Sequence, residues 1–429
     1  MEYLRYEELF DPELLKRPDQ DLSEVSSAVD EILSAVKERG DEAIREYEAR
    51  FDGSNLSSLY VTEEEFENAE KELPESLKMA IIEAHKNIEA FHKSELPAGE
   101  SVETAKGVLC WRRIVPIEKV GLYIPGGTAP LFSTVLMLAT PALIAGCKDI
   151  ILATPAKNNR VNPAILFASS VAGIKKIVKV GGAQAIAAFA YGTESISKRD
   201  KIFGPGNGFV SCAKLKVSSF VAIDMLAGPS EVMVVADKEA NPLFVASDLL
   251  SQAEHGKDSQ VVLLIKSKDK EEAREIYERV EEELEKEINK LNRKEYMLPS
   301  LSHSVAFSFS DNDSLIAAIN LYAPEHLIIN TADADDILSG VVNAGSVFLG
   351  QYTPESAGDY ASGTNHTLPT SGWAKSTAGV SVDSFIKKMT VQRITKEGIR
   401  ELAPVIMELA GAEGLTAHRE AVEVRIEND

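Results

Sequence analysis

The sequence predicts an α/β protein whose core consists of parallel, doubly wound sheets. From about residue 117 onward, short apolar segments alternate with segments in which apolar residues recur at helical spacing. Glycine-rich turns follow several of the apolar segments. This alternation is typical of successive strand–helix–strand units, and in such sheets ligands bind at the carboxyl ends of the strands.

Residues 1 to about 105 are expected to be mainly helical and strongly charged. Apolar residues recur at helical spacing over residues 22–40, where Gly40 is the expected C-cap, and again over residues 76–96. His85 and His92 lie on the second of these helices. Their charged surroundings show no spacing suited to metal ligands, so we interpret both as structural residues.

The first α/β stretch contains three glycine-rich turns. Its strands, each with the turn that ends it, are expected at residues 120–127, 149–156, 175–182 and 201–207. Backbone amides and helix N-termini in such turns can hold a pyrophosphate. None of the turns is a Walker loop or a clean G-x-G-x-x-G, and ordinary turn chemistry explains each one alone equally well. The residues beside these glycines that could contact a bound dinucleotide are Tyr123, Gln184 and Asn207.

A second α/β stretch is expected to begin with the strand in residues 221–237. Its further strands are expected at residues 260–265, 304–310, 326–330 and 345–350, with long helices at 244–256 and 268–292. The second helix is a run of charges with an apolar stripe, which is typical of a solvated face over a buried one. The tail from about residue 382 is expected to be helical and to form a small separate element.

The composition excludes several classes of function. Lys and Arg number 45 against 67 Asp and Glu, and the resulting net charge of −22 repels nucleic-acid backbones and anionic lipid. The three cysteines are widely spaced and provide neither a disulfide framework nor a thiolate zinc site. The acidic N-terminus is not expected to be a signal peptide, and no apolar stretch suffices to cross a membrane. We therefore predict a cytoplasmic protein.

Two short segments in the second half of the chain carry residues suited to metal binding or acid–base catalysis. Gln252 and His255 share one face of a helix, although a polar cap before Gly256 explains them at least as well. Glu325 and His326 stand together in one loop, where an acid and an imidazole offer two bases of different pKa. A turn with exposed polar residues is an equally good explanation of that second pair.

Two further segments lie closer to the C-terminus. Residues 352–370 form a long loop rich in Gly, Pro, Ser and Thr, which contains Asp359 and His366. Loops of that length in compact enzymes are usually functional or disordered. Glu413 and His418 follow near the end of the chain, where a solvated terminal helix is the simpler interpretation.

The distribution of histidines adds weight to these segments. Five of the seven histidines follow residue 250, and four of those five stand beside acids or amides in turn-like segments. Only His303 among the five is interpreted as structural. Because cysteine ligands are lacking, a metal site here would use His, Asp and amide oxygens, a mixed shell that suits zinc.

Several of these segments resemble the histidinol dehydrogenase family. The strings that carry the resemblance are, in order, IDMLAGPSEVMVVAD, DLLSQAEHG, YAPEHL, GDYASGTNHTLPT and EGLTAHREAV, and the glycine turns also fit. The resemblance extends from about residue 117 to residue 425. It implies the oxidation of L-histidinol through L-histidinal to L-histidine, at the end of histidine biosynthesis, by an enzyme that uses NAD and one zinc ion per subunit.

The resemblance also implies roles for individual residues. Glu325 and His326 would be the acid–base pair. The residues that would contact NAD are Tyr123, Gln184 and Asn207. The implied zinc ligands are Gln252, His255, Asp359 and His418. The implied substrate site consists of Ser230, Gln252, His255, His326, Asp359, Glu413 and His418.

The resemblance further implies two incomplete Rossmann-like domains and an intertwined homodimer in which C-terminal residues reach the partner's site. We expect a small N-terminal element at residues 1–20 and a discontinuous substrate and zinc domain of residues 21–116 and 230–380. Residues 117–229 are expected to form the NAD domain, and residues 381–429 a C-terminal helical element.

Three alternatives remain open at this point. A dehydrogenase with the same scaffold could oxidise a different polyol or amino alcohol. A zinc hydrolase could use Glu325 on a metal-bound water, but it predicts no dinucleotide site, and the glycine turns argue against it. A non-catalytic NAD-binding or assembly protein gives no reason for an acid–histidine pair beside a full set of metal ligands.

Overall fold

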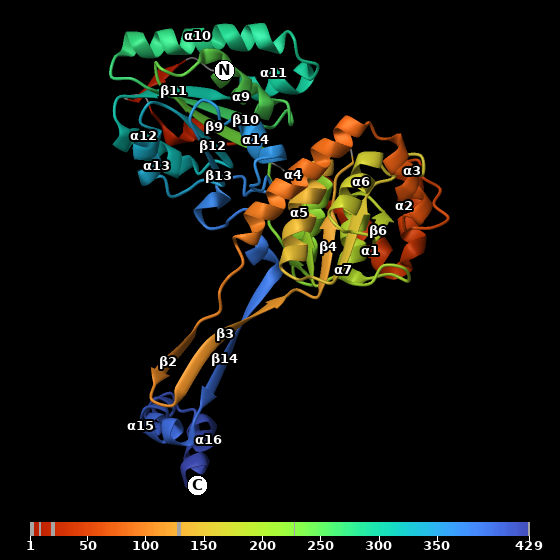
Figure 1. The fold of residues 1–429 in the computed structure, drawn as a ribbon, viewed down its shortest axis with the longest axis vertical. Coiled ribbons are helices and arrows are strands. Elements are labelled where there is room, and N and C mark those ends of the chain that lie inside the picture. Colours follow the sequence, from red (N-terminus) through yellow and green to blue (C-terminus); the bar gives the residue numbers. More distant parts are fainter. Residues whose placement is uncertain (1–3, 8–9, 19–21, 127–129, 227, 428–429) are drawn as a thin grey trace.

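The computed structural model describes residues 4–7, 10–18, 22–126, 130–226 and 228–427. It contains two α/β bodies side by side, and an arm that extends away from both of them and carries the C-terminus (Figure 1). Each α/β body is built on one parallel sheet. The prediction of an α/β protein with parallel sheets is confirmed.

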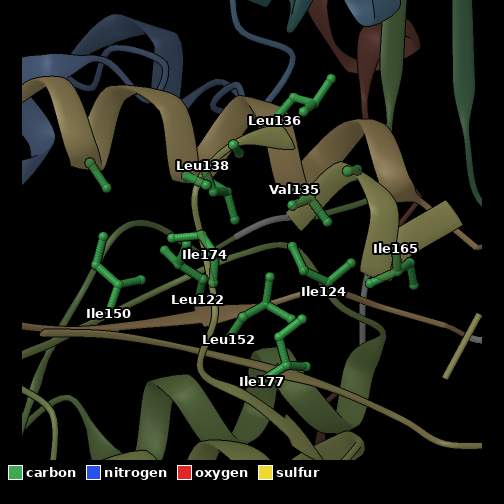
Figure 2. Close-up of a cluster of buried hydrophobic side chains, with 14 of the residues drawn as sticks. Leu122, Ile124, Val135, Leu136, Leu138, Ile150, Leu152, Ile165, Ile174 and Ile177 are labelled. Carbon is green, nitrogen blue, oxygen red and sulfur yellow. The ribbon is translucent and has the colours of Figure 1, made fainter. Parts of the chain in front are cut away.

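The first sheet has five strands in the order β6-β5-β4-β7-β8. They are β4 (Lys119–Tyr123), β5 (Asp149–Thr154), β6 (Ile177–Lys179), β7 (Lys201–Phe203) and β8 (Ala222–Ile223). The helices between them are α5 (Phe132–Ile144), α6 (Pro163–Val171), α7 (Gly182–Tyr191) and α8 (Gly208–Val217). Strand residues such as Leu122 and Leu152 pack against Val135 of α5 and Ile165 of α6 (Figure 2). Because helices cover both faces, the central strands are apolar on both sides.

Four N-terminal helices complete the covering of this sheet. They are α1 (Ser23–Arg39), α2 (Asp41–Phe51), α3 (Glu63–Glu72) and α4 (Glu75–Lys93). Val29 and Ile44 are buried with α7 and α8, whereas Ile88 is buried with α5 and α6. The prediction that this region joins residues 230–380 is therefore wrong. Helical spacing shows that each helix has an apolar face, but it does not show which sheet that face covers.

The second sheet has six parallel strands in the order β1-β11-β10-β9-β12-β13. The strands are β1 (Arg5–Tyr6), β9 (Glu231–Ala236), β10 (Gln260–Lys266), β11 (Val305–Phe309), β12 (His326–Asn330) and β13 (Ser346–Leu349). Its helices are α9 (Pro242–Ala253), α10 (Lys270–Ile288), α11 (Lys294–Ser302), α12 (Asn312–Tyr322), α13 (Ala334–Gly340) and α14 (Glu355–Tyr360). The N-terminal segment is part of this body, since β1 pairs with β11 and Leu15 is buried in its core. A separate element was expected there, but so short a segment cannot bury a core of its own.

Apart from the edge strand β1, both sheets have the same strand order. Counted from β4 or from β9 as the first strand, the order is 3-2-1-4-5, which is that of a dinucleotide-binding fold without its sixth strand. The order reverses between β4 and β7 in one sheet and between β9 and β12 in the other. The crevice at the carboxyl ends of β4 and β7 is therefore the expected position of a ligand.

The arm is an antiparallel sheet with two helices at its tip (Figure 1). Its elements are β2 (Ser101–Ala105), β3 (Val108–Pro116), β14 (Ile386–Ile394), α15 (Lys396–Ala412) and α16 (Thr416–Glu427). Two predictions are wrong here. Residues 101–116 belong to the arm and not to a domain with residues 230–380, and residues 386–394 form a strand where a helix was expected. β14 pairs with β3 along its whole length, so a partner distant in sequence decides its conformation.

Across the described ranges, no helix is both long and apolar enough to cross a membrane.

Candidate active site

The predicted acid–base residues lie at the amino edge of the six-stranded sheet. His326 is the first residue of β12, and Glu231 is the first residue of the neighbouring strand β9. This edge faces the carboxyl edge of the five-stranded sheet across a cavity of about 470 Å³. Its lining includes Gly204, Asn207, Ser230, His255, Glu325, His326, Asp359 and His366. The cavity therefore lies at the carboxyl ends of strands in only one of the two sheets.

Glu325 and His326 are both buried and are held by the backbone of β9. The Glu325 carboxylate accepts a hydrogen bond from the Glu231 N–H at 2.9 Å and lies 3.6 Å from Nδ1 of His326. That Nδ1 is also 3.2 Å from the Glu231 carbonyl oxygen, which can only accept. We therefore assign the proton to Nδ1, which leaves Nε2 of His326 available to act as a base. Nε2 has no hydrogen-bond partner and lies 3.5 Å from Asp359 Oδ1, which also lacks one.

The carboxylates around His326 make its surroundings strongly negative. Burial lowers the pKa of His326, but the charges of Glu355 and Glu325, together with the nearby Asp359 carboxylate, outweigh burial and raise that pKa well above its ordinary value. Burial chiefly raises the pKa of Glu355 far above its usual range. A cation bound among these carboxylates would offset their negative charge and lower the pKa of His326 again. Its Nε2 could then be unprotonated and accept a proton.

The structure brings three potential metal ligands together near the cavity. One ligand atom each from His255, Glu355 and Asp359 lies within 4.8 Å of the others. Gln252 lies in α9, three residues before His255, and is fully buried. With its amide oriented to satisfy its neighbours, Gln252 donates to Glu355 Oε2 at 3.0 Å and accepts from the Glu231 N–H at 3.1 Å.

This set of donors suits zinc. Imidazole nitrogen and carboxylate oxygen are common zinc ligands, and the unpartnered Oδ1 of Asp359 is a buried acceptor without a donor. Three of the four predicted ligands, Gln252, His255 and Asp359, lie in this region. Glu355 was not predicted, although its spacing of four residues from Asp359 on α14 places the two on one helical face.

Glu413 and His418 do not lie near these residues within one chain. Glu413 follows α15 and His418 belongs to α16, at the tip of the arm, far from α9 and α14 (Figure 1). Both side chains are exposed there. His366, in contrast, supports the site: its Nδ1 is 2.8 Å from the Asp359 carbonyl oxygen, and its Nε2 is 3.1 Å from Thr134 Oγ1.

The three residues predicted to contact a dinucleotide line a second cavity, of about 700 Å³. That volume falls within the range of small-molecule and cofactor sites. Tyr123 accepts a hydrogen bond from the Gly182 N–H at 3.1 Å, and Asn207 caps α8. Gln184 donates at 2.9 Å to Glu48, a buried carboxyl on α2 that also accepts from the Gly181 N–H at 2.9 Å. The N-terminal helices thus shape this cavity.

The glycine turns fit a closely approaching ligand. Gly204 has a φ of +124°, and a Cβ there would lie 2.0 Å from the Tyr123 carbonyl oxygen, so only glycine fits. A Cβ on Gly126 would lie 2.8 Å from the Pro155 side chain. These turns and the N-terminus of α8 leave bare backbone at the cavity wall, which suits a pyrophosphate.

A model of the histidinol dehydrogenase family matches residues 15–426. The chain belongs to the histidinol dehydrogenase family. It is 55% identical to the histidinol dehydrogenase of Bacteroides thetaiotaomicron over 96% of both chains, and 50% identical to that of Campylobacter jejuni strain RM1221 over 97% of this chain and 96% of the other. The crystal structure of histidinol dehydrogenase from Elizabethkingia anophelis matches with a TM-score of 0.93 and 48% identity, covering 97% of this chain and 95% of that one. The resemblance drawn from the sequence is confirmed, and the protein is an oxidoreductase.

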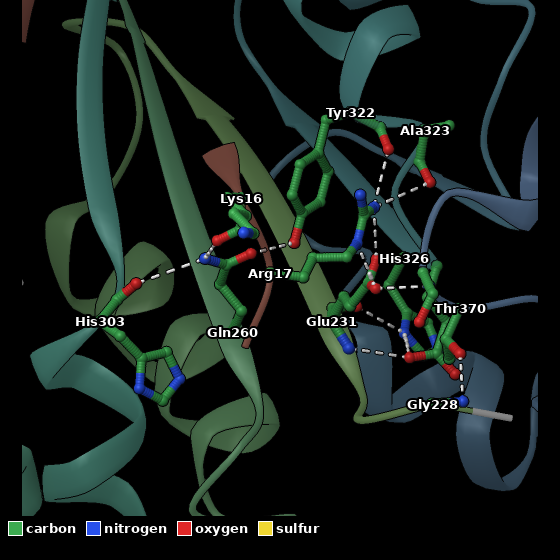
Figure 3. A network of polar contacts seen from close by, with 12 residues as sticks. Lys16, Arg17, Gly228, Glu231, Gln260, His303, Tyr322, Ala323, His326 and Thr370 are labelled. Atoms are coloured by element: carbon green, nitrogen blue, oxygen red, sulfur yellow. Dashed lines mark hydrogen bonds and ion pairs between the residues drawn. The ribbon is translucent and has the colours of Figure 1, made fainter. Parts of the chain in front are cut away.

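A network anchored by the N-terminal segment holds the predicted acid–base pair in place (Figure 3). Arg17 donates from Nε and Nη2 to the two carboxylate oxygens of Glu231, at 2.5 and 2.8 Å, and lies over the Tyr322 ring. Glu231 also accepts from the Ser371 N–H at 2.6 Å. The backbone N–H and carbonyl of Glu231 hold Glu325 and His326. The ion pair that fixes the Glu231 side chain therefore also helps to position these two residues. The sequence offered no signal for Arg17 or Glu231, since their contact spans 214 positions.

Proposed function

We propose that the protein is a zinc- and NAD-dependent enzyme that oxidises L-histidinol through L-histidinal to L-histidine, the final steps of histidine biosynthesis. The main support is the position of His326. Its free Nε2 lies in a cavity that adjoins the dinucleotide cavity, with Asn207 and His255 lining both. Substrate and NAD would then meet beside one base. A cytoplasmic location is part of this proposal.

The proposed binding sites use the residues that the sequence indicated. Zinc would be held by Gln252, His255, Asp359 and His418, and the substrate by Ser230, Gln252, His255, His326, Asp359, Glu413 and His418. Bound there, zinc would position the substrate by accepting its imidazole and amine nitrogens. NAD would bind beside Tyr123, Gln184 and Asn207 and accept a hydride in each of two oxidation steps.

The acid–base pair would move the protons. In the first step Nε2 of His326 takes the hydroxyl proton as the hydride leaves the carbinol carbon, which gives the aldehyde. In the second step Glu325 activates a water that adds to the aldehyde, and His326 removes a proton from the resulting diol as the second hydride leaves. The two steps remove four electrons, so two NAD molecules are consumed for each histidinol.

We further propose that the protein works as a homodimer in which Glu413 and His418 act in the partner's site. Both residues are exposed at the tip of an arm, apart from the other proposed ligands of their own chain. The arm also carries exposed apolar side chains, including Val405 and Leu409, which are 56% and 61% exposed. A partner subunit would cover such a surface.

Mixed dimers test this arrangement. His326→Ala and His418→Ala subunits are each expected to be inactive alone, but a mixed dimer would contain one site that keeps both residues. We expect appreciable activity after the two variants are unfolded and refolded together. Mixed dimers as inactive as either parent would contradict the arrangement in trans.

A dehydrogenase with the same scaffold that acts on another polyol or amino alcohol is the alternative. Incubation with zinc, NAD and histidinol, followed by the absorbance of NADH, separates the two. NADH formation with histidinol supports the proposal. Absence of NADH with histidinol, together with NADH formation from a different alcohol, supports the alternative.

A further inference from the structure

The dinucleotide cavity has two chemically different ends. At one end it shares Asn207 and His255 with the cavity that contains His326. Hydride transfer requires the nicotinamide to lie close to the base, so the nicotinamide belongs at this end. Phe51 and Asp52 also line the cavity, and Asp52 lies beside the loops after β5 and β6, on the other side of β4 from Asn207, which follows β7. The adenosine half then belongs at this end. Phe51 is the last residue of α2, and Asp52 is its C-cap.

The backbone at Asp52 is hydrogen-bonded to the loop that follows β5, although Asp52 is distant from that strand in sequence. The Asn158 N–H donates to the Asp52 carbonyl oxygen at 3.3 Å, and the Asn159 N–H donates to Ser54 Oγ at 2.9 Å. Ser54 Oγ in turn donates to the Ala156 carbonyl oxygen. These contacts join the loop after α2 to the loop after β5, so the backbone that carries Asp52 is held in place.

The carboxylate of Asp52 also lies beside the turn that follows β6. Its Oδ2 would be 3.2 Å from a Cβ placed on Gly181. Gly181 is the N-cap of α7, the helix that carries Gln184, one of the residues proposed to contact NAD. Asp52 therefore stands where the ends of the second and third strands of the 3-2-1-4-5 sheet meet the cavity.

Dinucleotide-binding sheets use an acidic residue in this region to distinguish NAD from NADP. The carboxylate accepts hydrogen bonds from the adenosine ribose hydroxyls, and its charge repels a 2′-phosphate. β5 continues into Pro155, Ala156 and Lys157 and has no acid of its own there. Among the described residues that line the cavity, only Asp52 and Glu254 are acidic, and Glu254 precedes His255 at the nicotinamide end.

We infer that Asp52 binds the adenosine ribose hydroxyls of NAD and excludes the 2′-phosphate of NADP. The inference rests on the proposed function, because it takes this cavity to be the dinucleotide site. Lys157 is close enough for its charge to act on the Asp52 carboxylate. Loss of the Asp52 carboxylate should therefore favour NADP over NAD in two ways. It removes the charge that repels the 2′-phosphate, and it leaves the Lys157 ammonium to attract that phosphate.

Binding measurements on the zinc-loaded, full-length protein test the inference. Isothermal titration calorimetry gives Kd for NAD, for NADP and for NAD that lacks the adenosine 2′-hydroxyl. Wild type should bind NAD most tightly. In Asp52→Asn the ratio of the NADP Kd to the NAD Kd should fall by about 10- to 100-fold, as expected when hydrogen bonds to a charged group are lost. Glu46→Gln, an exposed residue of the same helix, is the control and should keep the wild-type ratio.

The possible outcomes separate the inference from the proposed function. An unchanged ratio in Asp52→Asn would overturn the inference. Equal wild-type affinity for NAD and its 2′-deoxy analogue would also overturn it, even if the variant does not fold. Failure of the wild type to bind either dinucleotide would overturn the proposed function together with the inference.

Discussion

Replacement of Glu48 by Gln should make the protein less sensitive to rising pH. Glu48 is fully buried, and burial raises the pKa of its carboxyl from the ordinary 4.5 to about 7, against the hydrogen bonds from Gln184 and Gly181 that lower it. Above pH 4.5 the unfolded chain loses this proton while the folded chain keeps it, so the folded state loses stability until about pH 7. Between pH 5 and pH 8 this loss amounts to about 2–3 kcal/mol.

The assay is urea-induced unfolding followed by circular dichroism at both pH values. A glutamine at position 48 has no proton to lose, and its oxygen can still accept from Gly181 and Gln184. We expect Glu48→Gln to lose about 2–3 kcal/mol less than wild type between the two pH values. Glu42→Gln, an exposed residue of the same helix, should follow wild type. The same pH dependence in wild type and Glu48→Gln would refute the reasoning, because Glu48 would then titrate alike in the folded and unfolded chains.

Three further variants test the site. His326→Ala should reduce kcat by about 10²–10⁴-fold while zinc stays bound, because an acid–base group is lost; loss of stoichiometric zinc, measured by metal analysis, would refute this division of roles. His255→Ala should release zinc and weaken histidinol binding, and tight zinc retention in that variant would remove His255 from the ligand set. Arg17→Ala leaves the buried Glu231 carboxylate without its partner and should cost about 3 kcal/mol of stability. Thermal unfolding measures that loss, and Glu231→Gln in the same chain should recover part of it.

The parallel strands could be predicted because each is a short apolar segment bounded by turns. Strand β14 was missed because its conformation depends on pairing with β3, whose residues lie 270 to 286 positions away. The helices α1–α4 were assigned to the wrong body for a related reason. An apolar stripe is a local property of the sequence, whereas the choice of the sheet that it covers depends on the shapes of both surfaces.

In the site, too, residues in local motifs could be predicted, whereas residues that act through long-range contacts could not. Short strings such as Glu325–His326 could be recognised because the two residues are adjacent. Glu355 was missed, since its part in the cluster appears only when α14 and α9 are brought together. Arg17 and Glu48 lie in the N-terminal region, which carries no motif, and their roles follow from long-range contacts with Glu231 and Gln184. Residues that hold other residues in place leave little trace in a single sequence.

The stoichiometry of the reaction tests the central claim most directly. Zinc-loaded protein is incubated with excess NAD and a limiting, known amount of L-histidinol, and NADH is measured by absorbance while histidine is measured by chromatography. We predict two NADH and one histidine for each histidinol consumed. One NADH per histidinol with accumulation of the aldehyde, or no NADH at all, would contradict a four-electron oxidation that uses His326 in both steps.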